Sequence, residues 1–186
     1  MQRVRRGRQR GRQWCHAVVA LGGNVGDVPQ TFVRALQLLD DGATQVTLVS
    51  RLYQSTPLLL PRPRGPMIMA PYYNAACRVR TRLGPRELLR HLQAIERRLG
   101  RQRATLWGPR TLDLDLLIYG QRVMHGRRLT LPHGGIPFRA FVLAPMRDLQ
   151  VLRPWPYSPM RVTDLLQNSD DRSLGILHNQ LSWVVK

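Results

Sequence analysis

The order in which strand and helix patterns alternate constrains the fold of this 186-residue chain most. Apolar residues recur every three to four positions on an amphipathic helix and every two positions on a half-buried strand. From His16 to Tyr119 the order is strand, helix, strand, strand, helix, strand. This order is typical of the split βαβ arrangement. It predicts an α+β, ferredoxin-like sandwich in which two helices pack on one face of an antiparallel sheet.

Local signals set the boundaries of the predicted elements. The first strand begins at His16, and the first helix follows Asp27, which can cap it, with Pro29 in its first turn. The second helix begins after Gly84 and ends before Gly100. Its buried stripe has a 4-3-4 spacing and consists of Leu88, Leu92, Ile95 and Leu99. The remaining elements are three strands, a short extended segment and a last helix, over 45–53, 72–83, 111–119, 141–144 and 160–168.

The composition fits one globular domain behind a basic arm. Apolar residues make up 43% of the chain, and the formal net charge is +18. Six arginines lie in residues 1–13, which we expect to be a disordered arm, whereas 14–186 should form a single domain. The charge favours polyanionic partners, among them nucleic acid and nucleotide phosphates. For the arm itself, a solvated tail or sequence translated upstream of the true start is the favoured explanation.

Two further features of the composition bear on location. No run of about 18 apolar residues exists, so no transmembrane helix is expected. The Arg-rich start is not followed by an apolar segment, which argues against a secretory signal. The two cysteines, Cys15 and Cys77, match no disulfide or metal pattern. They indicate a reducing compartment, most simply the cytoplasm.

A carboxylate pair in the strand over 111–119 points to metal chemistry. Asp113 and Asp115 are two residues apart, so their side chains leave the same face of a strand. Mg²⁺ prefers such oxygens and shares its other positions with water and substrate phosphates. Arg110 adds a planar cation that fits phosphate. The segment predicts a metal-and-phosphate site, with a plain surface D-x-D on an edge strand as the alternative.

Other clusters can be interpreted in the same way. Tyr72 and Asn74 share a strand face and can stack on and hydrogen-bond a flat heterocycle. Glu96 lies beside an apolar stripe, where a nucleotide or a nearby arginine must supply a donor. His133 can neutralise phosphate charge or be purely structural. Residues 57–71 hold five prolines and suggest a lid or an irregular insertion.

Six motifs, taken together and in order, resemble one family. They are A-L-G-G-N-V-G-D, L-Y-Q-S-T-P, Y-Y-N-A-A, E-L-L-R-H-L-Q-A-I-E-R-R-L-G-R, W-G-P-R-T-L-D-L-D-L-L-I-Y-G, and L-P-H followed by R-A-F-V-L-A-P. The chain resembles the 2-amino-4-hydroxy-6-hydroxymethyl-7,8-dihydropteridine pyrophosphokinases of folate biosynthesis over roughly residues 16–150. The resemblance implies that ATP donates diphosphate to 6-hydroxymethyl-7,8-dihydropterin and leaves as AMP. It further implies two Mg²⁺ ions, a cytoplasmic monomer and mobile loops over the site.

The resemblance also implies a role for each matching residue. Asp113 and Asp115 would bridge the two metal ions, and they would form the catalytic set together with Arg101 and Arg110. The pterin would be contacted by Ser55, Leu58, Tyr72, Asn74, Trp107 and Phe141. The ATP site would be lined by Gln93, Glu96, Arg103, Arg110, Leu116, Arg128, Thr130, His133 and Arg139.

The chain departs from the family pattern at several positions. Ser is usual at Gly23, Thr at Ser55, Arg at Leu106, and Pro or an aromatic residue at Gly134, and the loop over 57–71 is longer than expected. These departures concern catalytic rate and lid closure more than substrate class.

Two other functions stay open, a diverged paralogue with slow turnover and a basic nucleic-acid-binding protein. The latter leaves the carboxylate pair unexplained, because carboxylates repel phosphate unless a metal is bound.

Overall fold

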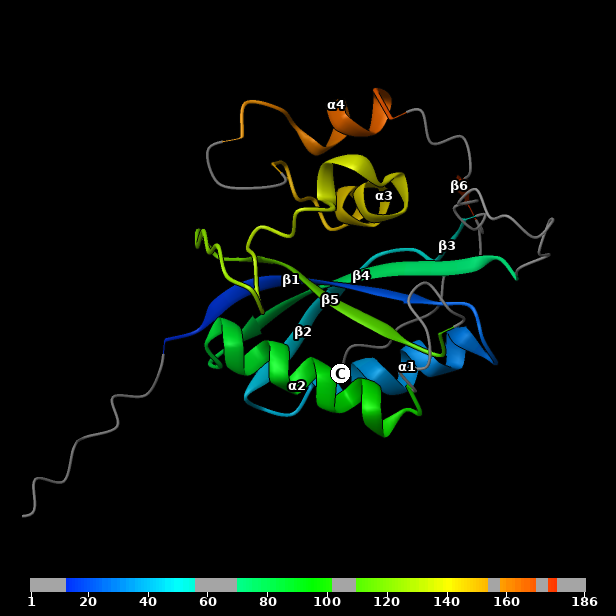
Figure 1. The fold of residues 1–186 in the computed structure, drawn as a ribbon, viewed down its shortest axis with the longest axis vertical. Helices are drawn as coiled ribbons and strands as arrows, with labels where there is room; N and C mark the ends of the chain where they lie inside the picture. Colours follow the sequence, from blue (N-terminus) through cyan, green and yellow to red (C-terminus); the bar gives the residue numbers. More distant parts are fainter. Residues whose placement is uncertain (1–12, 56–69, 102–109, 154–157, 170–173, 177–186) are drawn as a thin grey trace, which may run out of the picture.

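An antiparallel sheet runs through the middle of the molecule, with helices on both of its faces (Figure 1). The computed structural model describes residues 13–55, 70–101, 110–153, 158–169 and 174–176. The elements are β1 (Cys15–Gly23), α1 (Val28–Leu39), β2 (Thr44–Val49), β3 (Tyr53–Ser55), β4 (Tyr72–Thr81), α2 (Pro85–Arg98), β5 (Asp113–Tyr119), the 3-10 turn η1 (Ile136–Phe138), α3 (Ala140–Asp148), α4 (Val162–Gln167) and β6 (Leu174–Ile176). None of the described helices is long and apolar enough to cross a membrane.

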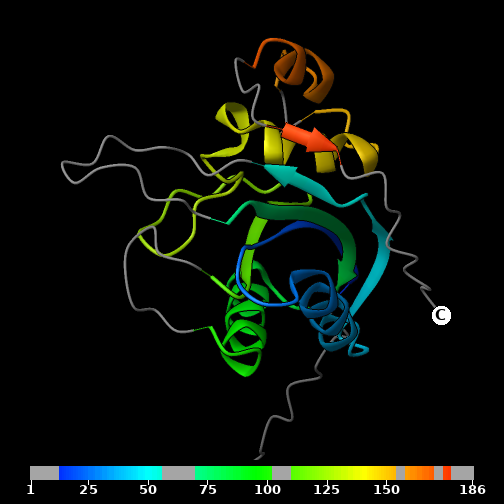
Figure 2. The same ribbon diagram turned by 90° about the vertical axis from the view of Figure 1, so that its right-hand side faces the viewer.

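The sheet confirms the predicted ferredoxin-like arrangement. Its strand order is β5-β1-β4-β3-β6, and β2 pairs with β4 next to β3. Each of these pairings is antiparallel, and β1 lies between β4 and β5. Figure 2 shows β6 beside β3, an addition that the sequence pattern did not predict.

The first face of the sheet is covered by α1 and α2, as predicted (Figure 1). Asp27 caps α1, since its Oδ1 accepts a hydrogen bond from the Gln30 amide at 3.1 Å. The helices bury Phe32, Leu88 and Leu92 completely against alternate residues of the central strands. Each such side chain contributes roughly 1.5–3 kcal/mol to folding.

The second face is covered by α3, and α4 packs on the outer side of α3 (Figures 1 and 2). The prediction of an extended segment over 141–144 is wrong, because these residues belong to α3. Leu143 and Met146 of α3 are fully buried and pack in one cluster with Val18 of β1. A short apolar run is compatible with both a buried strand and a buried helix. Periodicity alone therefore could not predict the helix here. The last helix, predicted over 160–168, is confirmed as α4.

The strand predicted over 45–53 is interrupted at Ser50. Val49 pairs with Cys77 and Tyr53 pairs with Asn74, so four steps on one strand oppose three on the other. Ser50 fills the interruption, because its amide donates to the Ala76 carbonyl and its Oγ accepts from the Ala76 amide, both at 2.9 Å. Such a bulge reverses which face the following side chains occupy. Tyr53 therefore reaches α3, whereas Val49 packs under the first face.

At the end of β1, the backbone of Thr111 lies so close to Gly23 that no side chain fits between them. A Cβ atom there would lie 2.8 Å from the Thr111 carbonyl oxygen and 3.2 Å from Val28 Cγ1. Gly23→Ala must therefore push the Thr111 backbone away, and we expect it to lower the free energy of unfolding by about 1–3 kcal/mol in urea titrations. Gly22→Ala is the matched control, since its Cβ would meet nothing closer than 3.8 Å. Equal stability of the two variants would contradict this account.

Candidate active site

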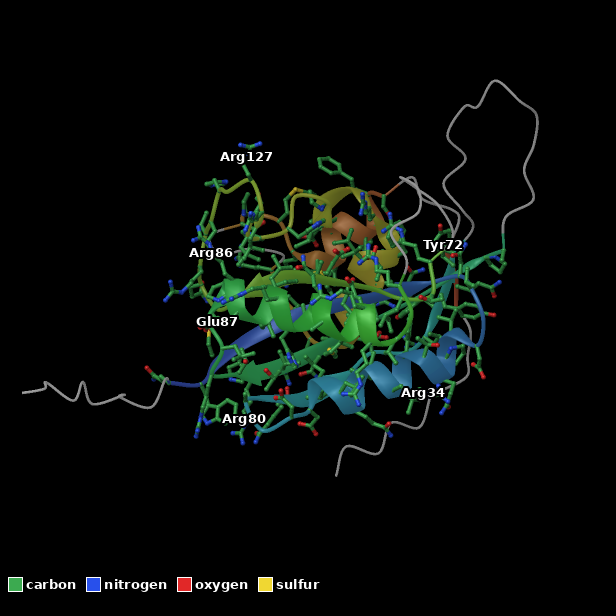
Figure 3. All side chains as sticks on the ribbon, turned by 60° about the horizontal axis from the view of Figure 1, so that its bottom comes forward. Arg34, Tyr72, Arg80, Arg86, Glu87 and Arg127 are labelled. Atoms are coloured by element: carbon green, nitrogen blue, oxygen red, sulfur yellow. The ribbon has the colours of Figure 1, made fainter. Side chains whose placement is uncertain are left out.

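The predicted polar groups gather at one end of the sheet, on the face that α3 covers. Asn74 of β4 pairs with Gly22 of β1, and Gly22 pairs with Asp113 of β5. Asp115 is two residues further along β5 and pairs with Ala20 of β1. Figure 3 shows Tyr72 at this end of the sheet and Arg80, of the same strand, at the other. The small residues of β1 thus separate the β4 polar pair from the two carboxylates.

Ser55, Asn74 and Phe141 are the described residues that can hold a flat heterocycle beside Tyr72. Asn74 Nδ2 donates a hydrogen bond to Ser55 Oγ at 2.9 Å, and both side chains are buried. Among the described residues, Asn74 Oδ1 has no hydrogen-bond donor, so an acceptor remains for a ligand. Phe141 is half-buried in the first turn of α3, with the Arg139 guanidinium 5.8 Å from its ring centroid.

Asp113 is held by two arginines. Its Oδ1 lies 2.8 Å from Arg101 Nη1, and its Oδ2 accepts a hydrogen bond from Arg110 Nη1. Both carboxylate oxygens thus face a guanidinium. These charged contacts are the ones that arginine makes best, since its donors are fixed in a planar fork.

Glu96 connects α2 to the edge strand β5. Its side chain is buried, and Oε1 accepts hydrogen bonds from the Leu114 amide at 2.7 Å and from Arg101. The Leu114 amide points outward from the sheet edge, where an unpaired donor needs a partner. Burial raises the pKa of Glu96, although both hydrogen bonds oppose the rise. The sequence left either a nucleotide or a nearby arginine as the donor to Glu96, and in the structure this donor is Arg101.

Asp115 is the carboxylate without a partner. Among the described residues it has no hydrogen bond and no ion pair within 4 Å, although its side chain is only partly exposed. Burial raises the pKa of Asp115, and the neighbouring Asp113 raises it further. The neighbouring His133, Arg139 and Arg101 side chains lower it and are outweighed. The described residues therefore compensate the charge of Asp115 only in part.

The two carboxylates fit a magnesium site that a substrate completes. The described part of the chain contains no group of three or more His, Cys, Asp or Glu side chains able to hold a metal ion. Mg²⁺ does not need one, because it is commonly bound by one or two carboxylates plus water and phosphate oxygens. Asp115 offers free oxygens for such an ion, whereas Asp113 must first exchange an arginine.

The sequence pattern did not predict the role of Asn24. The backbone N–H of Asn24 donates a hydrogen bond to the Arg110 carbonyl at 2.9 Å. The side-chain Oδ1 of Asn24 accepts one from the backbone N–H of Arg110 at 2.8 Å. These two bonds hold the backbone of Arg110 against the turn after β1. An asparagine directly after a glycine pair at a strand end was the available signal, and only the fold identifies its partner, 86 residues away.

The other residues predicted for ATP lie at varied distances from the acids. Gln93 is half-buried on α2, one turn before Glu96. Leu116 is buried in the core beneath the opposite sheet face, so only its backbone can reach a ligand on the Asp115 side. Arg128 and Thr130 are exposed in the segment after β5.

His133 and Arg139 meet around one glycine. His133 Nδ1 accepts a hydrogen bond from the Gly135 amide at 3.2 Å. A Cβ on Gly135 would lie 3.2 Å from atoms of both side chains, so the imidazole and the guanidinium flank it closely. Several predictions lie outside the described residues. They are Leu58, Arg103, Leu106, Trp107, the arm over 1–12 and most of both closing loops, over 57–69 and 102–109.

Comparisons with known proteins agree with this geometry. The family model described as 7,8-dihydro-6-hydroxymethylpterin-pyrophosphokinase (HPPK) matches residues 18–151. The 2-amino-4-hydroxy-6-hydroxymethyldihydropteridine pyrophosphokinase of Synechocystis sp. is 39% identical over 160 residues, which cover 85% of this chain and 78% of that protein. The enzyme of the same name from Haemophilus influenzae is 35% identical over 159 residues, covering 85% and 95%.

Longer proteins match over part of their length. The mitochondrial folate synthesis bifunctional protein of Arabidopsis thaliana is 43% identical over 133 residues, which are 71% of this chain and 23% of that protein. The crystal structure of wild-type Plasmodium falciparum HPPK-DHPS superposes with a TM-score of 0.65 at 13% identity, covering 83% of this chain and 44% of that one. At that identity the superposition supports the fold alone.

The two carboxylates should respond oppositely to neutralisation. Asp115→Asn removes a poorly compensated buried charge, so we expect it to raise the free energy of unfolding at pH 7 by roughly 0.5–2 kcal/mol. Because the pKa of Asp115 is raised in the folded state, this gain should shrink as pH falls and the native carboxyl binds a proton. Urea titrations between pH 4 and 8 measure both effects.

Asp113→Asn is the matched comparison. It removes the charge that pairs with Arg101 and Arg110, so stability should fall by about 1–3 kcal/mol. A loss of stability in Asp115→Asn as large as that in Asp113→Asn would show that Asp115 is compensated after all.

Proposed function

Because the chain belongs to the 7,8-dihydro-6-hydroxymethylpterin-pyrophosphokinase family, we propose that it transfers the terminal diphosphate of ATP to the hydroxymethyl oxygen of 6-hydroxymethyl-7,8-dihydropterin. AMP is the second product, and the reaction belongs to folate biosynthesis. One observation supports this most directly: the polar pair of β4 and the carboxylates of β5 lie on one sheet face, with only Gly22 and Ala20 between them.

The pterin lies on the β4 side of Gly22 and Ala20, the small residues of β1. Asn74 offers its free Oδ1 to a ring N–H group, while Ser55 fixes the amide orientation. Tyr72 and Phe141 supply aromatic surface for the flat ring. On motif position alone, we add Leu58 and Trp107 to the pterin contacts and Arg103 to the nucleotide contacts.

The diphosphate lies over β5. Asp113 and Asp115 hold Mg²⁺, which when bound neutralises phosphate charge and aligns the attacking and leaving oxygens. Arg101 and Arg110 then exchange Asp113 for phosphate oxygens, which their planar donors fit equally well. Positioning and electrostatics dominate such transfers, so no protein general base is required.

The nucleotide lies along the β5 edge. Glu96 holds Arg101 and the β5 backbone in place from α2, and Gln93 lies one turn away. Arg139 supplies positive charge near Asp115, and His133 offers an imidazole to the phosphates. Leu116 contributes backbone, and Arg128 and Thr130 complete the exposed rim.

One chain supplies every residue proposed for both substrates, so we propose a monomer. Both cysteines of the sequence are free thiols, and Cys77 is fully buried. Free thiols without a disulfide favour a reducing compartment, and we propose the cytoplasm. The domain we propose covers 14–186, with 1–13 as a separate arm.

The proposed function is tested by AMP release with the pterin, ATP and Mg²⁺. The wild-type chain should release AMP, and Asp115→Ala should release less than 1% as much while keeping its circular dichroism spectrum and a melting temperature at least as high as that of the wild type. The fold should survive because no described residue hydrogen-bonds to Asp115. Asp40→Ala, an exposed carboxylate after α1, is the control that should retain turnover. No AMP from the wild type would favour a diverged paralogue, and full turnover by Asp115→Ala would contradict the metal assignment.

Magnesium affinity should depend on nucleotide. Both Asp113 oxygens face arginines in the substrate-free protein, so Mg²⁺ alone should bind at least tenfold more weakly than Mg²⁺ with a non-hydrolysable ATP analogue. Arg110→Gln frees Oδ2 and should strengthen binding of Mg²⁺ alone while weakening binding of the analogue. Calorimetry measures all four affinities. Equal Mg²⁺ affinity of the wild type with and without the analogue would contradict the exchange of arginines for metal.

A further inference from the structure

A partly buried hydrogen-bond cluster joins β3 and the residues before it to the end of α3, behind the proposed pterin side of the site. Asp148, the last residue of α3, accepts from the Tyr53 hydroxyl at 2.7 Å. It also accepts from the Arg51 amide and Nε at 3.1 Å each and from Arg51 Nη2 at 2.9 Å. We name Arg51, Tyr53 and Asp148 the β3–α3 anchor.

Both oxygens of Asp148 are engaged, and the anchor has a buried side and a side open to water, since the Arg51 side chain is 42% exposed. Tyr53 is fully buried, and the side chain of Asp148 is 12% exposed. The Tyr53 hydroxyl also lies 3.4 Å from the Ala144 carbonyl, one turn back along α3. Burial opposes ionisation of Asp148, but the hydrogen bonds from Arg51 and Tyr53 outweigh it and lower the pKa of the carboxyl. Asp148 is therefore ionised at neutral pH.

Each side of the anchor leads directly to a residue of the proposed pterin site. Ser55, the hydrogen-bond partner of Asn74, lies two residues after Tyr53 on the same strand face. Phe141 lies seven residues before Asp148, two turns along the same helix. The anchor thus fixes the strand that carries one wall of the site to the helix that carries the other.

Apolar packing alone does not fix this relation. Leu143 and Met146 hold α3 against the sheet, but contacts between apolar side chains are non-directional and tolerate sliding. The bonds to Asp148 have defined lengths and angles and set the position of α3 along and about its axis. The bulge at Ser50 serves the same arrangement, since it turns Tyr53 toward α3.

We propose that Arg51, Tyr53 and Asp148 are positioning residues that set the distance between Phe141 and the Ser55–Asn74 pair, and so the width of the pterin site. The proposal rests on the function proposed above. None of the three residues needs to touch substrate. The nucleotide side also has Glu96, Arg101 and Asn24, away from β3 and the anchor, whereas, of its described residues, only Arg139, the N-cap residue of α3, would move with the helix. Loss of the anchor should therefore impair pterin binding more than ATP binding.

Tyr53→Phe tests this with the smallest change, because it keeps the buried ring and removes only the hydroxyl. We expect KM for the pterin to rise about tenfold, with KM for ATP changed less than twofold. Asp148→Asn, which removes the charge that Arg51 binds, should have the larger effect in the same direction. The measurements are steady-state kinetics in each substrate and calorimetry of pterin with a non-hydrolysable ATP analogue and Mg²⁺.

Tyr119→Phe is the matched control. Its hydroxyl also donates to a backbone carbonyl, that of Leu83 at 2.7 Å, and its side chain packs in the core beneath the other sheet face. It should lower the melting temperature about as much as Tyr53→Phe and leave both KM values unchanged. Equal rises in pterin and ATP KM for Tyr53→Phe, or equal behaviour of the two tyrosine variants, would overturn the positioning role.

The calorimetry separates this proposal from the function on which it rests. If the wild type binds pterin and Tyr53→Phe binds it equally well, only the positioning role is overturned. If the wild type binds no pterin in the presence of nucleotide analogue, the proposed function fails, and the positioning role fails with it.

Discussion

The site depends on a row of residues paired across three strands. Asn74, Gly22 and Asp113 lie side by side in the sheet register, and the central member has no side chain. A Cβ there would reach within 3.9 Å of both neighbours, so any larger side chain would occupy the space that separates them. The two proposed requirements, an amide for a heterocycle and carboxylates for a cation, would be met two strand spacings apart, about 10 Å, on a rigid surface. Rigid strands hold such spacing better than loops do.

Electrostatic balance explains why the rest of the site is arranged around this row. Asp113 and Asp115 share a face and repel each other, and burial strengthens the repulsion. Arg101 and Arg110 neutralise Asp113, and they are themselves fixed by Glu96 and Asn24, respectively. Asp115 is compensated only in part. A substrate that brings Mg²⁺ and phosphate oxygens completes the balance, because the metal satisfies the acids and the phosphates satisfy the arginines.

The sequence predicts the parts of this structure that depend on local periodicity. The six-element order, the cap at Asp27 and the common face of the two carboxylates follow from spacings of two and of three to four residues. The helix at Ala140–Asp148 does not, because its apolar run is too short to show a period. Partners distant in sequence could not be predicted either: Asp148 binds Arg51 across 97 residues, and only the completed sheet brings them together.

Net charge is a poor guide to what this protein recognises, whereas buried charge is a good one. The labelled arginines Arg34, Arg80 and Arg127 lie at separate places on the described part of the chain, so these three cations do not form one patch (Figure 3). Arg80 stacks on Trp14 at 4.9 Å from the ring centroid, which uses its cation locally. Exposed charges are screened by water and salt, but those in partly buried sites are not. We therefore expect Arg101 and Arg110, partly buried and directed at Asp113, to contribute more to the proposed phosphate binding than the more numerous surface arginines.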